Sequence, residues 1–158
     1  MKKKLLIGIP AVLMVIFALL QLTNPPRTNP PVINDMMATN PPPAEVATLL
    51  HAACYDCHSH ETKWPLYSKI APISWQVADD VEEGRKNFNF SDWPTDPTRM
   101  AKRLENLSDE IDNHEMPLPK YLLMHPEARL TDAQRKTIMD WAAATADKLR
   151  SVAVSTNQ

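Results

Sequence analysis

The sequence predicts an all-α fold, in which about four short helices form one small domain. Beyond position 43, apolar residues recur at intervals of three or four, which is the period of an amphipathic helix, and no stretch alternates convincingly as a strand. The 158 residues include only two glycines against 15 prolines. So few glycines exclude a dinucleotide-binding fingerprint, a phosphate-binding loop and a hairpin-rich β fold, because each needs glycine for positive φ or close backbone approach.

Charge and cysteine content exclude further classes of protein. The net charge is −2, so nothing favours nucleic acid as a partner. Two cysteines are too few for a disulfide scaffold or a four-cysteine zinc site. With 44% hydrophobic and 23% charged residues, the composition is that of an ordinary globular protein.

Residues 1–23 have the pattern of a membrane segment. Lys2 to Lys4 precede an apolar run, Leu5 to Leu22, whose only polar side chain is Gln21. A cationic start followed by an apolar run engages a secretion machinery. The run is long for a signal peptide and offers no good pair of small residues for cleavage, so we expect an uncleaved N-terminal membrane helix. The domain would then face the periplasm from the inner membrane, whereas a cleaved signal would release it there.

Residues 24–43 contain seven of the 15 prolines and cannot form a regular helix or a central strand. Two alternatives stay equally open for this segment. It is either a semi-rigid spacer between the membrane and the domain, or a segment that wraps the domain through Val32, Ile33, Met36 and Met37. Beyond residue 23 the chain has 14 basic and 19 acidic side chains, a net charge of −5, so the exported part is acidic.

Four helices are predicted within the domain, which spans residues 44–150 with its first turn reaching back into the prolines. They begin at Pro41 with Asn40 as the N-cap, near Pro72, at Pro97 with Asp96 as the N-cap, and at Thr131, which has capping-box spacing to Gln134. Their expected buried faces are Val46, Leu49, Leu50 and Ala53; Ile73, Val77, Val81, Gly84 and Phe88; Met100, Leu104, Leu107 and Ile111; and Ile138, Trp141, Ala142, Thr145 and Leu149. Residues 151–158 are predicted to be a disordered tail. Loops 59–71 and 115–130 are long for mere connections, so something else is expected to organise them.

Both cysteines lie in one motif, Cys54-Tyr55-Asp56-Cys57-His58. C-x-x-C-H is the attachment sequence of c-type haem. Two thiols at this spacing at a helix end can each add to one haem vinyl group, while the adjacent imidazole lies under the porphyrin and ligates the iron. The motif therefore predicts haem c, attached covalently through Cys54 and Cys57 and ligated by His58, inside a small cytochrome c-like helical domain.

Other chemistries of this motif are disfavoured by its context. A disulfide oxidoreductase would need a βαβ setting, which is absent. A zinc site could recruit a fourth ligand such as His60, but consecutive Cys57 and His58 chelate one tetrahedral ion poorly. A plain structural disulfide is the remaining alternative. The preceding helix, the expected export and the lack of spare cysteines favour haem.

The sixth iron ligand has several candidates: Met100, Met116, Met124, His51, His60, His114 and His125. Met116 is favoured because it precedes Pro117 in a loop, where no helix face competes for its side chain. His60 is too close to His58 to reach the opposite haem face. His114, His125 and an open position stay as alternatives. Methionine–histidine ligation suits electron transfer, whereas an open position suits gas or peroxide chemistry.

Further side chains could contact the haem edge. Trp64 and Tyr67 follow the motif closely and combine apolar bodies with polar tips, so either could line the haem or bind a propionate. Arg85 or Lys69 could pair with a propionate, and the sequence does not choose between them.

Several segments in order along the chain carry a family resemblance: Cys54-Tyr55-Asp56-Cys57-His58-Ser59, Glu61-Thr62-Lys63-Trp64-Pro65, Ile70-Ala71-Pro72-Ile73-Ser74-Trp75, Val81-Glu82-Glu83-Gly84-Arg85, Asn89-Phe90-Ser91-Asp92-Trp93, Glu115-Met116-Pro117 and Tyr121-Leu122-Leu123-Met124-His125-Pro126. With these, the chain resembles the bacterial haem-binding domain family, which is related to cytochromes c, over about residues 25–145. The resemblance implies a monohaem c-type protein with His58 as the proximal ligand. By analogy with Met-Pro in cytochromes c, it implies Met116 as the distal ligand.

These observations predict a membrane-tethered periplasmic monohaem cytochrome that transfers single electrons and is not an enzyme. Its expected partners are an unidentified redox protein, the haem attachment machinery and the membrane through the N-terminal helix. Two alternatives stay open: a haem sensor or peroxidase-like protein with an open sixth position, and an assembly factor that uses C-x-x-C without haem.

Overall fold

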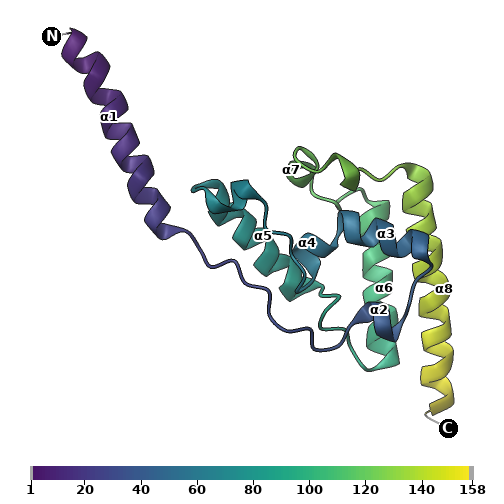
Figure 1. Ribbon diagram of the computed structural model, residues 1–158. Helices are drawn as coiled ribbons and strands as arrows, with labels where there is room; N and C mark the ends of the chain where they lie inside the picture. The colour runs from purple at the N-terminus through teal and green to yellow at the C-terminus, as the bar shows by residue number, and fades with distance from the viewer. Residues whose placement is uncertain (1, 157–158) are drawn as a thin grey trace.

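The computed structural model describes residues 2–156, and its regular structure is helical (Figure 1). In chain order the elements are α1 (Lys2–Leu20), the 3₁₀ turn η1 (Gln21–Thr23), α2 (Met36–Thr39), α3 (Ala44–Ala53), α4 (Tyr55–His58), η2 (Leu66–Lys69), α5 (Ile73–Asn87), α6 (Pro97–Asp112), α7 (Pro119–Leu122), η3 (Pro126–Ala128) and α8 (Asp132–Thr156). The described residues form no strand, and their one extended pairing is an isolated bridge between Asn34 and Asp92. The all-α prediction is confirmed.

Helices α6 and α8 lie side by side and form the main helix pair (Figure 1). Both begin at the predicted caps: the Asp96 side chain accepts from Arg99 N at 2.8 Å, and Thr131 and Gln134 exchange side-chain and backbone hydrogen bonds. The pair buries the predicted stripe of α6 against small and branched residues of α8, namely Met100, Leu104, Leu107 and Ile111 with Ile138, Ala142 and Ala146. Each large apolar side chain buried here contributes about 1.5–3 kcal/mol.

Two helix predictions need correction at their ends. The first helix was expected from Pro41, but α3 begins at Ala44 with Pro43 as its N-cap, because each proline disfavours helical geometry in the residue before it. Asn40 instead accepts a hydrogen bond from Trp93 Nε1 at 2.9 Å. The disordered tail predicted at 151–158 is also wrong for its described part, since α8 continues to Thr156 without a glycine or proline to interrupt it.

The second predicted helix forms as α5, but its apolar stripe is only partly buried. Val81 is buried, whereas Ile73 is 52% exposed because it stands in the first turn of the helix. Gly84 serves a different purpose from core packing, described below. The predicted faces of α3 and α6 are confirmed, since their four apolar positions are all buried. On α8, Ile138 and Ala142 are buried, whereas the other three predicted positions, Trp141, Thr145 and Leu149, are half-buried.

The N-terminal segment forms helix α1, which points away from the other helices (Figure 1). No helix in the described part of the chain is long and apolar enough to cross a membrane, so the predicted membrane-spanning helix over 1–23 is not supported. The physical reason is length: lysines occupy its first turn and its apolar part runs only from Leu5 to Leu20, whereas a bilayer core needs about 20 apolar residues.

Residues 24–43 wrap the domain rather than standing off from it. Met36 is fully buried in the core, and its backbone N–H donates to Phe90 O at 2.9 Å. Ile33 N donates to Ser91 O at 2.9 Å, but the Val32 and Ile33 side chains are exposed, so they are not the anchors. Of the two alternatives left open by the sequence, the wrapping segment is the one that the structure shows, with Met36 as its main anchor.

The core joins this wrapping segment to α3, α6 and α8 through a group of aromatic rings. Tyr55 stacks on Phe90 with ring centroids 4.7 Å apart, and Phe88 and Trp93 pack against the same ring. The cluster comprises Met36, Val46, Leu49, Leu50, Tyr55, Phe90, Trp93, Met100, Ala101, Leu104, Leu107, Ile111, Ile138, Ala142 and Ala146. Because Tyr55 belongs to the C-x-x-C-H motif, the core holds that motif in place.

Candidate functional site

His58 is held in one orientation by two backbone carbonyls of α5 and its C-terminal cap. Its Nδ1 lies 3.0 Å from Gly84 O and 2.9 Å from Phe88 O. A carbonyl oxygen can only accept, so Nδ1 carries the proton and donates to them. Nε2 therefore keeps its lone pair, and it has no hydrogen-bond partner among the described residues. A metal-ligating histidine usually donates its other ring N–H to a carbonyl or carboxylate oxygen. This hydrogen bond fixes the orientation of the ring and leaves the ligating nitrogen free.

The protonation state of His58 also suits ligation. Burial lowers the pKa of its imidazole below the ordinary 6.5, although the hydrogen bonds to Phe88 and Gly84 oppose this shift. The ring is thus neutral at physiological pH. A neutral imidazole is the form that binds a metal.

Both thiols of the motif are free and partly buried beside this imidazole. Burial raises the pKa of Cys54 and of Cys57 to about 12, with smaller contributions at Cys54 from the Cys57 thiol and at Cys57 from Asp80 and Asp56. In the folded chain they are therefore neutral thiols. No disulfide joins them, so the structural-disulfide alternative has no support here.

Gly84 lets α5 approach the motif closely. A Cβ built on Gly84 would lie 2.6 Å from Cys57 O, closer than real Cβ atoms approach, and 3.2 Å from Cys57 Cβ, which is also tight. The same residue supplies one of the carbonyls that orient His58. Glycine is required at this position for the close contact between two backbones.

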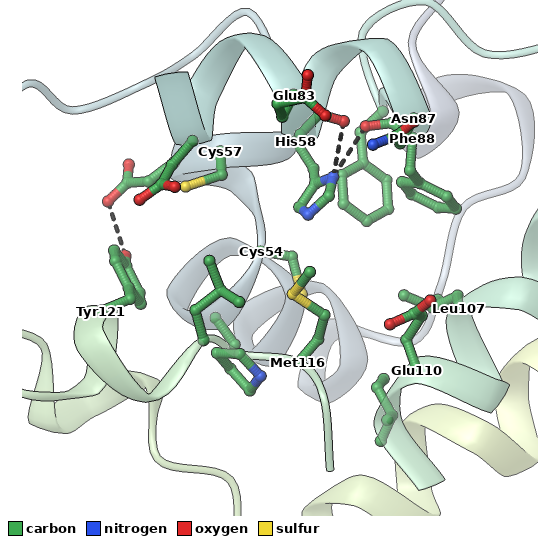
Figure 2. A pocket seen from close by; sticks show the side chains of 18 of the residues that line it. Cys54, Cys57, His58, Glu83, Asn87, Phe88, Leu107, Glu110, Met116 and Tyr121 are labelled. Atoms are coloured by element: carbon green, nitrogen blue, oxygen red, sulfur yellow. Dashed lines mark hydrogen bonds between the residues drawn. The ribbon is translucent and has the colours of Figure 1, made fainter. Parts of the chain in front are cut away.

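His58, Cys54 and Cys57 line a cavity of about 320 Å³ together with Met116. Figure 2 shows the His58 imidazole on the α5 side of this cavity and Met116 on the side facing it. The remaining lining is largely apolar and includes Phe88, Phe90, Leu107, Ile111, Leu118 and Leu130. The cavity thus joins two thiols, one free imidazole nitrogen and one thioether inside an apolar lining.

Met116 reaches the cavity because α6 ends abruptly. His114 adopts a left-handed conformation, with φ at 57°, and its N–H donates to Ile111 O. Glu115 N then donates to Glu110 O at 3.0 Å, which completes the hydrogen-bond pattern of a Schellman end. The chain reverses here, so that Met116 lies beside the last turn of α6 at the cavity.

The other candidate ligands lie elsewhere. Met100 is buried in the core and His51 and His114 are exposed. His60 is engaged at both ring nitrogens, by Pro31 O and by the Asn89 side chain. Met124 and His125 line a second cavity, described below. Of the sequence-predicted candidates, only Met116 shares a cavity with Cys54 and His58.

A family model described as a haem-binding domain matches residues 15–144. The chain belongs to the haem-binding domain family. Comparison with curated proteins and comparison with solved structures give no match. This haem-binding domain offers the donor set that a haem needs, because a free imidazole nitrogen, two thiols and a thioether meet at one largely apolar cavity. By contrast, no three His, Cys, Asp or Glu side chains in the described residues group as a metal-ion site, so the zinc alternative has no support.

The haem-binding domain carries a second cavity of about 230 Å³ on the far side of Cys57. Tyr67 Oη lies 2.7 Å from His125 Nε2, and His125 Nδ1 lies 3.0 Å from the Glu127 carboxylate. Tyr121 donates to Asp56 at 2.9 Å, and burial with Asp56 raises the pKa of Tyr121 well above its ordinary range. These polar groups form hydrogen bonds with one another, and two of these bonds hold loop 115–130 against Tyr67 and against Asp56 of the motif.

The predicted propionate partners are placed differently. The Arg85 guanidinium donates to backbone and side-chain oxygens of Thr28, Asn29, Ser59 and Thr62 and lines neither cavity; Lys69 is exposed and also lines neither. Trp64 bonds Asn29, and Tyr67 faces the second cavity. The charged side chains that line the cavity beside His58 are acidic instead: Asp56, Asp80, Glu83 and Glu110. The sequence alone could not show this arrangement, since it depends on how α5 and α6 face each other.

Proposed function

We propose that this haem-binding domain is an exported monohaem c-type cytochrome that carries single electrons and converts no substrate of its own. The observation that carries the proposal is the His58 imidazole, whose Nε2 is free beside the two thiols and faces Met116 across the cavity. When bound, haem supplies one-electron oxidation and reduction.

The roles of the residues follow from their chemistry. The thiols of Cys54 and Cys57 would hold the haem through two thioether bonds, each formed by addition of S–H across one vinyl double bond. His58 would bind the iron through Nε2, because Nδ1 is already bonded to Gly84 O and Phe88 O. Met116 would supply a thioether sulfur from the facing side of the cavity. The largely apolar lining would limit the access of water to the iron.

Export is part of the proposal. Thioether attachment requires the haem attachment machinery, and the lysines and apolar run of residues 1–23 are the pattern that directs a chain out of the cytoplasm. The expected location is the periplasm. Fractionation of cells, with the mass of the purified chain, tests export and shows whether residues 1–23 are retained; a full-length chain in the cytoplasm would contradict it.

Co-expression with the haem attachment machinery tests the cofactor. After acid extraction of the denatured protein, haem should remain on the chain, and the double variant Cys54→Ala/Cys57→Ala should lose it. Haem that is extracted from the wild-type chain would contradict covalent attachment. No haem at all would support the assembly-factor alternative.

Spectra of the purified protein test the role in electron transfer. The oxidised protein should show the methionine-to-iron charge-transfer band, and Met116→Ala should abolish it. The reduced wild-type protein should bind carbon monoxide slowly or not at all. Immediate binding would favour the sensor or peroxidase alternative, because it reveals an open sixth position.

A further inference from the structure

The backbone of Met116 is tied to the helix pair α6–α8 by one arginine. Arg135 Nη1 donates to Met116 O at 3.0 Å and to Ile111 O at 3.1 Å. One nitrogen thus bridges the Ile111 carbonyl in the last turn of α6, which also accepts from His114 N, and the carbonyl of Met116, the residue that faces His58. A charged donor makes these hydrogen bonds stronger than neutral ones.

The N-terminal side of Met116 is secured separately. The reversal at His114 brings the Met116 N–H within 3.2 Å of Glu110 O. Pro117, which follows, is buried and has no N–H to offer. Without Arg135, the Met116 carbonyl would have no other hydrogen-bond donor among the described residues, and the loop would be held from one side only.

Arg135 is itself well placed for this task. It stands in the first turn of α8, behind the Thr131–Gln134 capping box, and α8 packs along α6. Within the described part of the chain, no carboxylate lies within ion-pair distance of its guanidinium, and the side chain is partly buried. Its guanidinium therefore donates to the carbonyls of Ile111 and Met116 and forms no ion pair among the described residues.

We propose that Arg135 is the positioning residue for the sixth iron ligand, holding the Met116 loop so that the thioether sulfur stays on the iron. This inference rests on the proposed function, in which Met116 is that ligand. Arg135 does not touch the haem in this proposal. It acts on the rate at which the sulfur leaves.

The experiment measures imidazole binding to the oxidised holoprotein by stopped flow. At saturating imidazole, the rate equals the rate at which the Met116 sulfur leaves the iron, because imidazole enters only when the position is open. Arg135→Met keeps an apolar stem of similar length but removes the donor. We expect it to raise this rate about tenfold, the effect of losing one charge-assisted hydrogen bond. Arg135→Lys retains a charged donor and should fall between that variant and the wild type.

The matched control is Arg129→Met. Arg129 Nη2 also donates to a backbone carbonyl, Leu122 O at 3.1 Å, but that carbonyl lies at the end of α7, away from the turn that holds Met116. We expect the wild-type imidazole rate from this control. Thermal unfolding of every variant is measured in parallel, since a merely structural role would lower stability without changing the exchange rate well below the unfolding transition.

The outcomes separate the two proposals. If Met116→Ala abolishes the charge-transfer band but Arg135→Met binds imidazole at the wild-type rate, Arg135 does not position the ligand. If Met116→Ala leaves the band intact, the sixth ligand lies elsewhere and both assignments fail. Should Arg135→Met fail to fold, Arg135→Lys decides: an exchange rate equal to that of the wild type and of Arg129→Met would overturn the inference.

Discussion

At the scale of single residues, Gly84 brings helix α5 into close contact with the C-x-x-C-H motif. Its carbonyl orients His58, and its missing side chain leaves room for the Cys57 backbone. With only two glycines in the chain, one is thus used where two backbones meet. The contact cannot relax by moving a flexible side chain, because the nearest atoms are backbone atoms.

Gly84→Ala should therefore destabilise the protein by about 1–3 kcal/mol, the usual cost of forcing an extra methyl group into a packed site. Denaturant unfolding measures this loss. Gly8→Ala is the matched control, because a Cβ there meets nothing within 4 Å and alanine favours the helix. Equal stability of Gly84→Ala and the wild type would show that α5 can shift away from Cys57 freely.

Glu110 offers a test of the acidic lining of the cavity beside His58. Burial, then the nearby Glu115 and Asp109, raise the pKa of Glu110 above the ordinary 4.5. The folded state therefore holds this proton more tightly than the unfolded state does. The contribution of the protonated Glu110 to the free energy of unfolding is fully present below pH 4.5 and is lost as pH rises through the folded pKa.

Glu110→Gln should consequently stabilise the protein at pH 7 and have no such effect near pH 3.5, about one unit below the ordinary carboxyl value. Denaturant unfolding at both pH values checks this difference. Glu82→Gln, at an exposed position of α5 outside the cavity, serves as the control. A gain of the same size at both pH values would mean that the glutamate charge is not responsible.

At the scale of elements, the short helix α2 anchors a segment that is otherwise rich in proline. Asp35 caps this helix by accepting from Met37 N at 3.1 Å, and Met36 is fully buried beneath it. The backbone N–H groups of Ile33 and Asn34 donate to Ser91 O, and that of Met36 donates to Phe90 O, shortly after the end of α5. The proline-rich segment is thereby part of the folded domain.

Met36→Ala should cost about 2–5 kcal/mol of stability, as expected when a large buried side chain leaves a cavity. Met124→Ala is the control, because that side chain is 62% exposed and its loss should change stability by about 0.5 kcal/mol or less. Urea unfolding compares the two. If both variants unfold at the wild-type urea concentration, the segment does not contribute to the core.

At the scale of the whole molecule, Arg85 connects three distant parts of the chain. It donates from α5 to Thr28 O and Asn29 Oδ1 in the wrapping segment, at 3.0 Å each. It also donates to Ser59 O at 2.8 Å and Thr62 Oγ1 at 2.9 Å, shortly after the C-x-x-C-H motif. Burial lowers the pKa of this guanidinium, but an arginine remains charged at all physiological pH values.

Arg85→Met should lower the free energy of unfolding by about 1.5–3 kcal/mol and expose residues 24–31 to proteases. The reason is that the charged donor then bonds neither to residues 28 and 29 nor to residues 59 and 62. Limited proteolysis with mass spectrometry locates the cleavage. Lys86→Met, at the next and exposed position of α5, should be cleaved like the wild type. Protection of residues 24–31 from cleavage in Arg85→Met would show that other contacts are enough to hold this segment on the domain.

Some features were determined by the sequence alone. The helical period, the caps at Asp96 and Thr131 and the C-x-x-C-H motif are local signals, and each depends on residues within a few positions of one another. The buried stripe of α6 could be read from spacing for the same reason. The haem-binding family follows from motifs of this local kind.

The tertiary structure decided what depends on residues far apart in the chain. Three contacts join positions about 20 or more residues apart. His58 bonds to two carbonyls of α5 and its cap, Arg135 bonds to Met116 O, and residues 33–36 bond to residues 90 and 91. Arg85 shows the limit most clearly: its charge suggested a propionate partner, yet its position on α5 turns it toward backbone oxygens. The chemical type of a side chain determines which bonds it can form, but only the packing of the chain determines which partner lies within reach.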